Sequence, residues 1–249
     1  MLTYYLPKRK KIKNELRIAK TAVDDTKKWI KICQKQGKIR KLSTPAPLIK
    51  IIDYKAGNAP SVLHAVNRLG YKAVLAKDHR EIADATHLIL PGVGSAKATM
   101  TSLQDMNLIG ALEDAVLQKK VPFLGICVGM QILFEHSEEE DADCLGWLKG
   151  RVVKFDTAKV RVPQMGWNQV RFVKNTPCNF RDDFFYFVNS YYAKLENESD
   201  QWGVADYVGL FTAAVCRDNI FATQFHAEKS GKSGLALLNN FLRYEHKPE

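Results

Sequence analysis

The feature that most restricts the fold is a short apolar run ending in a turn with glycine on both sides of a cysteine. The run from Val121 to Ile126 is typical of a buried strand in the middle of a parallel sheet. It passes through Gly125-Ile-Cys-Val-Gly129 into a predicted helix whose apolar face holds Met130, Leu133 and Phe134. A strand, a sharp turn and a helix in this order match a nucleophile elbow, with cysteine in place of serine.

The chemistry expected of Cys127 follows from this position. At the carboxyl end of its strand the sulfur would meet the positive end of a helix, which favours the reactive thiolate. The backbone N–H of Val128 could then point at the negative oxygen of a tetrahedral intermediate. The alternative is a buried structural cysteine in an ordinary strand–helix turn. A catalytic role requires a base elsewhere in the chain.

The rest of the chain from Leu48 indicates an α/β domain. Before the elbow, predicted strands alternate with helices and end in turns, which predicts a mostly parallel sheet covered on both faces. Beyond it, strands follow one another with few helices, which indicates an antiparallel extension of the same sheet. The last two predicted elements are the apolar strand Ile220–Phe225 and a helix over 234–244.

Charge separates the N-terminal segment from this domain. Residues 1–47 hold fourteen Lys and Arg against three acidic residues, so the net charge of +10 belongs to them and the remainder is close to neutral. We predict a basic extension, 1–47, outside the fold, and one domain, 48–249. The cluster from Lys8 to Lys13 leaves open an arm that binds nucleic acid or another anionic partner. The simpler interpretation is an extension with no such role.

Cysteine usage and hydropathy bear on the class of protein. Five cysteines, without a C-x-x-C pair, indicate neither a disulfide framework nor a zinc site and fit a reducing cytoplasm. The sequence has no apolar run of about 18 residues, so no membrane span is expected.

The base that Cys127 requires is best supplied by His226. Of the six histidines, it alone follows a predicted strand, at the edge where a parallel sheet collects its active site. Glu228, two residues on, could hold the imidazole in one tautomer. H-x-E is a weak signal by itself, and it gains weight from the G-x-C-x-G segment. Pro91-Gly-Val-Gly94 also follows a strand and could present N–H groups to an oxyanion, or be an ordinary turn.

Six segments in this order resemble one known family, the class I glutamine amidotransferases. The resemblance covers about residues 48–245 and is closest to glutaminase subunits that serve a cyclase in histidine biosynthesis. The matching segments are Ile52-Asp-Tyr-Lys-Ala-Gly-Asn58, Leu90-Pro-Gly-Val-Gly94, Gly125-Ile-Cys-Val-Gly-Met-Gln131, Met165-Gly-Trp-Asn168, Phe187-Val-Asn-Ser-Tyr-Tyr192 and Gln224-Phe-His-Ala-Glu-Lys-Ser230.

The resemblance implies a flavodoxin-like fold and a Cys-His-Glu glutaminase without metal or other cofactor. Its partner would be a cyclase subunit, in a heterodimer that makes imidazole glycerol phosphate and aminoimidazole carboxamide ribotide. The residue roles that it implies are a triad of Cys127, His226 and Glu228; an oxyanion site at Gly92, Val93, Gly94 and Val128; glutamine binding by Gln131, Glu139, Ser190 and Tyr191; and a partner face with Asn58, Tyr186 and Lys229.

Four positions depart from the family pattern: Lys55 stands where Gly is common, Gln164 and Asn189 where His is common, and Ala227 where Pro is usual. Because several lie near the expected pocket or partner face, they bear on the partner more than on the chemistry. A paralogue that feeds a sugar amidotransferase in surface polysaccharide synthesis is the alternative. Two further classes are a lone cysteine hydrolase and a non-catalytic module that binds nucleic acid through residues 1–47.

Overall fold

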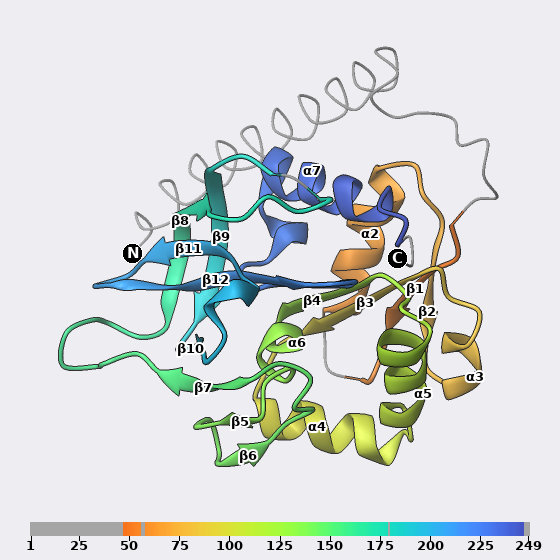
Figure 1. Cartoon of the computed structure of the whole chain (residues 1–249), viewed down its shortest axis with the longest axis horizontal. Coiled ribbons are helices and arrows are strands. Elements are labelled where there is room, and N and C mark those ends of the chain that lie inside the picture. Colours follow the sequence, from red (N-terminus) through yellow and green to blue (C-terminus); the bar gives the residue numbers. More distant parts are fainter. Residues whose placement is uncertain (1–46, 56–57, 179, 247–249) are drawn as a thin grey trace, which may run out of the picture. The chain divides into compact units, whose positions relative to one another are not determined.

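The computed structural model describes residues 47–55, 58–178 and 180–246. The predicted extension lies outside these residues apart from Pro47, so its role stays a prediction. Within the described chain, the prediction of an α/β fold with a parallel core and an antiparallel extension is confirmed (Figure 1).

Five parallel strands form the core of the sheet, in the order β2-β1-β3-β4-β13. Their buried central strands β3, β4 and β13 contain almost only apolar residues, as expected where both faces are covered. Figure 1 shows helices α2 and α7 on one face of these strands and α4 and α5 on the other. The bounds are β1 Ile49–Ile52, α2 Ala59–Arg68, β2 Ala73–Ala76, α3 His79–Ile82, β3 His87–Gly92, α4 Ala96–Asp105, α5 Ile109–Glu113, β4 Phe123–Cys127, β13 Ile220–Thr223 and α7 Gly231–Leu242.

The antiparallel extension begins at β12 and continues through β10 and β7, while β11, β8 and β9 form a branch from β12. Strand β9 pairs over its whole length with residues 164–170 of β8, and every second residue of β8 is exposed. The bounds here are β5 His136–Ser137, β6 Ala142–Asp143, β7 Gly150–Lys154, β8 Gln164–Phe172, β9 Asp183–Asn189, β10 Tyr191–Leu195, β11 Gln201–Asp206 and β12 Leu210–Arg217.

The helix after the elbow is shorter than predicted. It is α6, Val128–Gln131, and Leu133 and Phe134 lie beyond it although both are buried. The carbonyls that would continue the helix are taken by a neighbouring loop: the N–H groups of residues 145, 146 and 148 donate to the carbonyls of residues 132, 134 and 133. Tertiary hydrogen bonds therefore end a helix that the apolar spacing would extend.

Other elements also differ from the sequence expectations. One of the helices expected between the strands before the elbow is α5, which begins at Ile109 and continues as a π-helix over Asp114–Gln118. Helix α4 and strand β10 were not predicted. Ser95 begins α4, and its hydroxyl accepts a hydrogen bond from the N–H of Ala98 at 3.2 Å.

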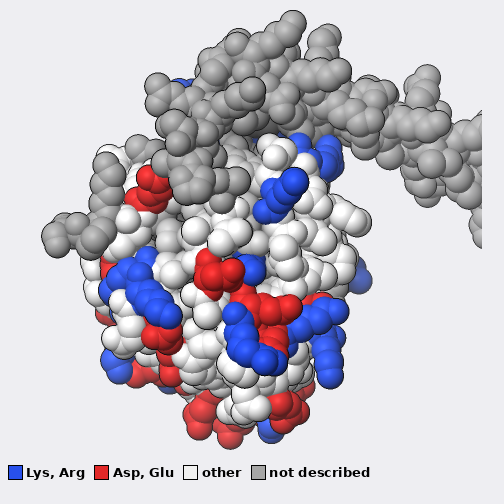
Figure 2. Space-filling model, turned by 90° about the vertical axis from the view of Figure 1, so that its right-hand side faces the viewer, with Lys and Arg blue, Asp and Glu red and all other residues white. Residues whose placement is uncertain are grey.

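Charged side chains of both signs are interspersed over the described residues on the face drawn in Figure 2. This agrees with the near-neutral balance of the chain after residue 47. Among the described residues, no helix is both long enough and apolar enough to cross a membrane.

Candidate active site

The carboxyl ends of the parallel core strands meet at one edge of the sheet, and the elbow lies there. Cys127 ends β4 with φ of 56° and ψ of −111°, a backbone conformation that costs free energy for a residue with a side chain. The positive φ falls on the cysteine itself and on neither of the flanking glycines, Gly125 and Gly129. Strain at this residue is characteristic of a nucleophile elbow.

The flanking glycines have a different task, which is close packing. A Cβ added at Gly129 would lie 2.0 Å from the carbonyl oxygen of Leu90, and one added at Gly125 would lie 2.4 Å from the carbonyl oxygen of Gly129. The two glycines thus let β3, β4 and α6 approach so closely that only hydrogen atoms fit between them. This close packing fixes the backbone on both sides of Cys127.

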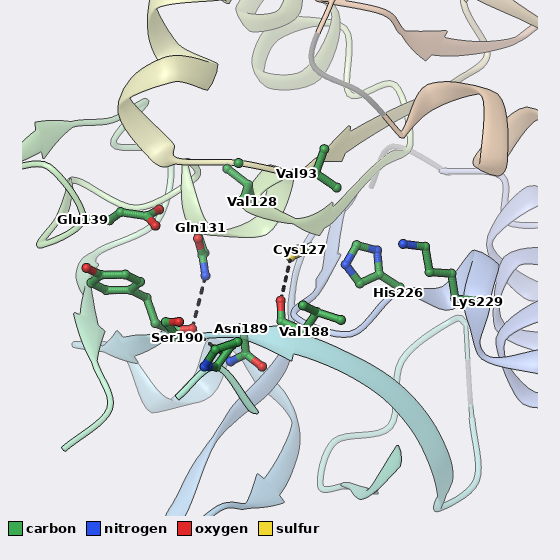
Figure 3. Close-up of a pocket in the computed structure, with 13 residues that line it drawn as sticks. Val93, Cys127, Val128, Gln131, Glu139, Val188, Asn189, Ser190, His226 and Lys229 are labelled. Carbon is green, nitrogen blue, oxygen red and sulfur yellow. Dashed lines mark hydrogen bonds between the residues drawn. The ribbon is translucent and has the colours of Figure 1, made fainter. Parts of the chain in front are cut away.

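His226 and Glu228 follow β13, the strand beside β4. The imidazole Nδ1 of His226 lies 2.8 Å from Oε1 of Glu228, and both side chains are almost fully buried. Figure 3 shows the imidazole facing Cys127. Burial, the largest effect, lowers the pKa of His226, but its interactions with Cys127 and Glu228 together raise that pKa to about 9.

Asn58 contacts the same carboxylate oxygen of Glu228 as the imidazole does. Its amide nitrogen donates to Oε1 of Glu228, and only 7% of the residue is exposed. In this chain Asn58 therefore faces the triad rather than an open surface. Of the other two expected partner-facing residues, Lys229 is exposed, and Tyr186 is half-buried with its ring against Trp167 at 6.1 Å.

A cavity of about 280 Å³ opens beside the sulfur. It brings together nearly all of the predicted site residues outside the partner face, and Figure 3 shows several of them around the cavity. Of the expected oxyanion residues, Gly92 does not line it but pairs with Cys127 in the β3–β4 register. The lining consists of Val93, Gly94, Cys127, Val128, Gln131, Glu139, Pro163, Val188, Asn189, Ser190, Tyr191, His226 and Lys229.

The end of the cavity away from His226 is polar. The amide nitrogen of Gln131 donates to the carbonyl of Tyr191 at 3.2 Å and to the side-chain oxygen of Gln224 at 3.0 Å. Figure 3 shows the amide oxygen of Gln131 pointing away from Ser190. Glu139 accepts a hydrogen bond from the N–H of Ala96 at 3.2 Å. Partial burial raises the pKa of Glu139, and this hydrogen bond opposes the rise.

Several site residues were missed from the sequence. Val188 presents its carbonyl to the sulfur of Cys127 at 3.9 Å, and Pro163 and Asn189 line the cavity. Gln224 is fully buried against Cys127. A signal for Gln224 was present, since a large amide in an apolar strand-end segment before a candidate base requires buried hydrogen-bond partners.

The departures from the family pattern occupy distinctive positions. Lys55 has φ of 68°, a conformation that favours glycine. Gln164 and Asn189 are opposite each other at one end of the β8–β9 pair, and both are buried. Ala227 is buried and begins the 3₁₀ turn that carries Glu228.

The described residues contain no cluster of three or more His, Cys, Asp or Glu side chains suited to a metal ion. All four cysteines in this part of the chain are free.

Comparison with known proteins decides the family. The model of the family "Glutamine amidotransferase class-I" matches residues 50–244. The chain belongs to the class I glutamine amidotransferases. The sequence resemblance is thereby confirmed, and the chain is a glutamine amidotransferase enzyme. The family match leaves the individual site residues as predictions, which the geometry above supports.

The curated relatives of this amidotransferase match most of this chain and nearly all of their own length. "Imidazole glycerol phosphate synthase subunit HisH" from Leptospira interrogans is 42% identical over 78% of this chain and 98% of its own length. "Imidazole glycerol phosphate synthase subunit HisH 2" from Methanococcus maripaludis is 42% identical over 79% of this chain and 99% of its own length. A Campylobacter jejuni protein named as subunit HisH 1 is 43% identical over 79% and 100%.

Solved structures agree on the fold of this amidotransferase. One titled "Crystal structure of glutamine amidotransferase" has a TM-score of 0.65 at 16% identity, covering 78% of this chain and 98% of its own. "Structure of PurLQS from Thermotoga maritima" has a TM-score of 0.65 at 16% identity, covering 80% and 99%. At this identity the likeness bears on the flavodoxin-like fold alone.

Proposed function

We propose that this enzyme is the glutaminase subunit of an imidazole glycerol phosphate synthase, with residues 48–249 as its amidotransferase domain. The observation that carries the proposal is the arrangement of Cys127, His226 and Glu228 at one end of a cavity whose other end holds Gln131 and Glu139. Relatives at 42–43% identity that bear this subunit's name support the same partner and pathway.

The first half of the proposed reaction forms a thioester. The thiolate of Cys127 attacks the side-chain amide carbon of glutamine, and the carbonyl electrons move onto oxygen. The N–H of Val128 and backbone N–H groups of residues 92–94 receive this oxyanion. Protonated His226 transfers its proton to the nitrogen as the C–N bond breaks, and ammonia leaves.

The second half consumes water. Neutral His226 removes a proton from a water molecule, whose oxygen attacks the thioester carbon. The tetrahedral intermediate collapses with loss of the Cys127 thiolate, and glutamate is released. Glu228 remains ionised throughout and stabilises the imidazolium, which explains why its carboxylate is held on Nδ1. The net reaction converts glutamine and water into glutamate and ammonia.

Glutamine is selected at the polar end of the cavity. The carboxylate of Glu139 is partly buried, which raises its pKa, so a substrate cation there would offset the cost of its ionisation. The α-ammonium group of glutamine supplies that cation, and the amide oxygen of Gln131 accepts one of its hydrogen bonds. The backbone of Ser190 and Tyr191 completes this end of the cavity.

The partner is proposed to be the cyclase subunit, in a heterodimer. Near the triad, strands β8 and β9 expose large apolar side chains: Met165 is 66% exposed, Trp167 56% and Phe184 53%. Such a group beside a cavity is characteristic of a protein interface. Tyr186 and Lys229 join this face. Ammonia then passes to the cyclase, which makes imidazole glycerol phosphate and aminoimidazole carboxamide ribotide.

The location proposed for the enzyme is the cytoplasm, where free thiols such as that of Cys127 stay reduced. No cofactor enters the proposed chemistry, since every proton and electron pair is supplied by glutamine, water and the triad.

The test is glutamate release from glutamine by the full chain, alone and with the histidine-pathway cyclase and its ribonucleotide substrate. Strong stimulation by the cyclase supports both the chemistry and the partner. Activity indifferent to that cyclase would retain the triad and favour a sugar amidotransferase as acceptor. Cleavage of peptides without a partner would instead indicate a lone hydrolase.

One variant distinguishes the proposed glutaminase activity of this chain from the activity of the cyclase. Cys127→Ala removes the nucleophile, so glutamine-dependent turnover should fall by at least about 10³-fold. Turnover of the cyclase with added ammonium should persist. Retained glutamine-dependent turnover in this variant would exclude the proposed mechanism.

A further inference from the structure

The side chain of Gln224 lies between the sulfur of Cys127 and the wall of the cavity that holds Gln131. It is fully buried, so its amide has no access to water. Its amide nitrogen is 3.7 Å from Sγ of Cys127, and its amide oxygen accepts a hydrogen bond from Gln131 at 3.0 Å. One side chain thus touches both the proposed nucleophile and a residue of the proposed glutamine pocket.

The orientation of this amide is set by its neighbour. The Gln131 nitrogen is a donor only, and its second bond runs to the Tyr191 carbonyl. The oxygen of Gln224 must therefore face Gln131, which turns its NH₂ group toward the sulfur. The backbone is held as well, because the N–H of Gln224 donates to the carbonyl of Ala213 at 2.9 Å. The side-chain NH₂ group of Gln224 is therefore held as a hydrogen-bond donor to the sulfur of Cys127.

We propose that Gln224 is a positioning residue that stabilises the Cys127 thiolate and links its position to the glutamine pocket. This inference rests on the proposed function and adds a role at the same site. An N–H···S contact strengthens when sulfur carries negative charge, so the amide favours the reactive form. Gln224 touches no substrate atom, because Gln131 and Cys127 separate it from the cavity. Its removal should therefore lower kcat by a larger factor than it raises KM, since Gln131 loses one of its two acceptors.

Two substitutions at this position separate the donor from the shape. Gln224→Met keeps a similar length and loses the N–H. Gln224→Glu keeps an acceptor for Gln131 but sets a carboxylate against the sulfur. Gln164→Met is the matched control, since Gln164 is another buried amide and is absent from the cavity lining. All are made in the full chain.

The decisive readout is the rate of Cys127 alkylation by iodoacetamide as a function of pH, with peptide mapping to isolate Cys127 from the other cysteines. The midpoint of the profile should move to higher pH in Gln224→Met and further in Gln224→Glu, and stay in place in Gln164→Met. A residue with a merely structural role would leave the midpoint of Gln224→Met in place, whereas the shift in Gln224→Glu shows only that this position acts electrostatically on the sulfur. With glutamine and the cyclase, kcat should fall about tenfold to a hundredfold in Gln224→Met, as expected for a lost hydrogen bond to a charged group.

An unchanged midpoint in Gln224→Met would overturn the proposal, as would a fall in kcat matched by an equal rise in KM. If Gln224→Met does not fold, Gln224→Leu, which also lacks the N–H and the charge, takes its place, with an unchanged midpoint as the contrary result. Because alkylation needs neither glutamine nor a partner, it judges the role of Gln224 even if the cyclase gives no stimulation. That outcome would count against the proposed function only.

Discussion

The two walls of the cavity differ in how far the strands that form them are buried. One wall is formed by the ends of β3, β4 and β13, which are buried throughout and carry Cys127 and His226. The other includes Pro163, which precedes β8, and the end of β9; along β8 every second residue is exposed, among them Trp167. The parallel core surrounds the reacting groups with buried residues, while the antiparallel pair β8–β9 also has exposed apolar side chains, where the proposed partner would bind. Chemistry and assembly can therefore be altered separately.

The largest expected effect lies on the first wall, at Glu228. Glu228→Gln keeps the size of the side chain but removes the charge that stabilises the imidazolium of His226. We expect kcat to fall about 10²- to 10⁴-fold, because the imidazole loses both its fixed tautomer and its counter-charge. Steady-state glutamate release with the cyclase measures this. A loss smaller than about tenfold would show that Glu228 has no part in orienting the base.

The second wall is addressed at Trp167. Trp167→Ala should weaken cyclase binding by about 2 kcal/mol, or about thirtyfold in Kd, as for an aromatic residue central to an interface. Titration of the cyclase against stimulated glutaminase activity gives this Kd. Val74→Ala is the control, since Val74 is also exposed but lies on β2 at the far edge of the core. Equal effects of the two variants would break the proposed division between the walls.

Asn58 sharpens the comparison because it was expected on the partner face and lies against Glu228. Asn58→Ala should lower kcat about tenfold, as the buried carboxylate loses one donor. The Kd for the cyclase, measured in the same titration, should change less than in Trp167→Ala. A change in the Kd without a change in kcat would show instead that Asn58 acts in cyclase binding.

The smallest effect is a shift in the titration of His226. Its pKa is about 9 because Cys127 and Glu228 outweigh burial. In Cys127→Ala part of that support is gone while burial remains, so the pKa should fall. NMR titration of the imidazole protons measures it, with the other five histidines as internal controls.

The sign of the pH dependence follows from the same values. Because the folded pKa exceeds the ordinary value of 6.5, these contacts stabilise the folded chain most below about pH 6.5. Their contribution is lost as pH rises through about 9. Thermal unfolding of the unmodified chain should therefore lose more stability over that range than unfolding of Cys127→Ala does. An identical loss in both would contradict the assigned cause.

Local sequence patterns predicted the strands of the parallel core and the positions of the reacting residues. Apolar runs that end in turns predicted the parallel core, and the G-x-C-x-G and H-x-E segments predicted which strand ends carry the chemistry. These signals are local because strand burial and turn geometry are set by adjacent residues. Six segments in order were enough to indicate the family.

The contacts between residues that are far apart in the chain could be read only from the tertiary structure. The end of α6 at Gln131, the place of Asn58 beside Glu228, and the contact of Gln224 with the sulfur all depend on hydrogen bonds between residues that are far apart in the chain. Such partners leave no periodic trace in the sequence, since a buried amide satisfies its donors with whatever the fold brings within about 3 Å. The sequence thus predicted the reacting residues, and the packing of the chain determines which side chains contact them.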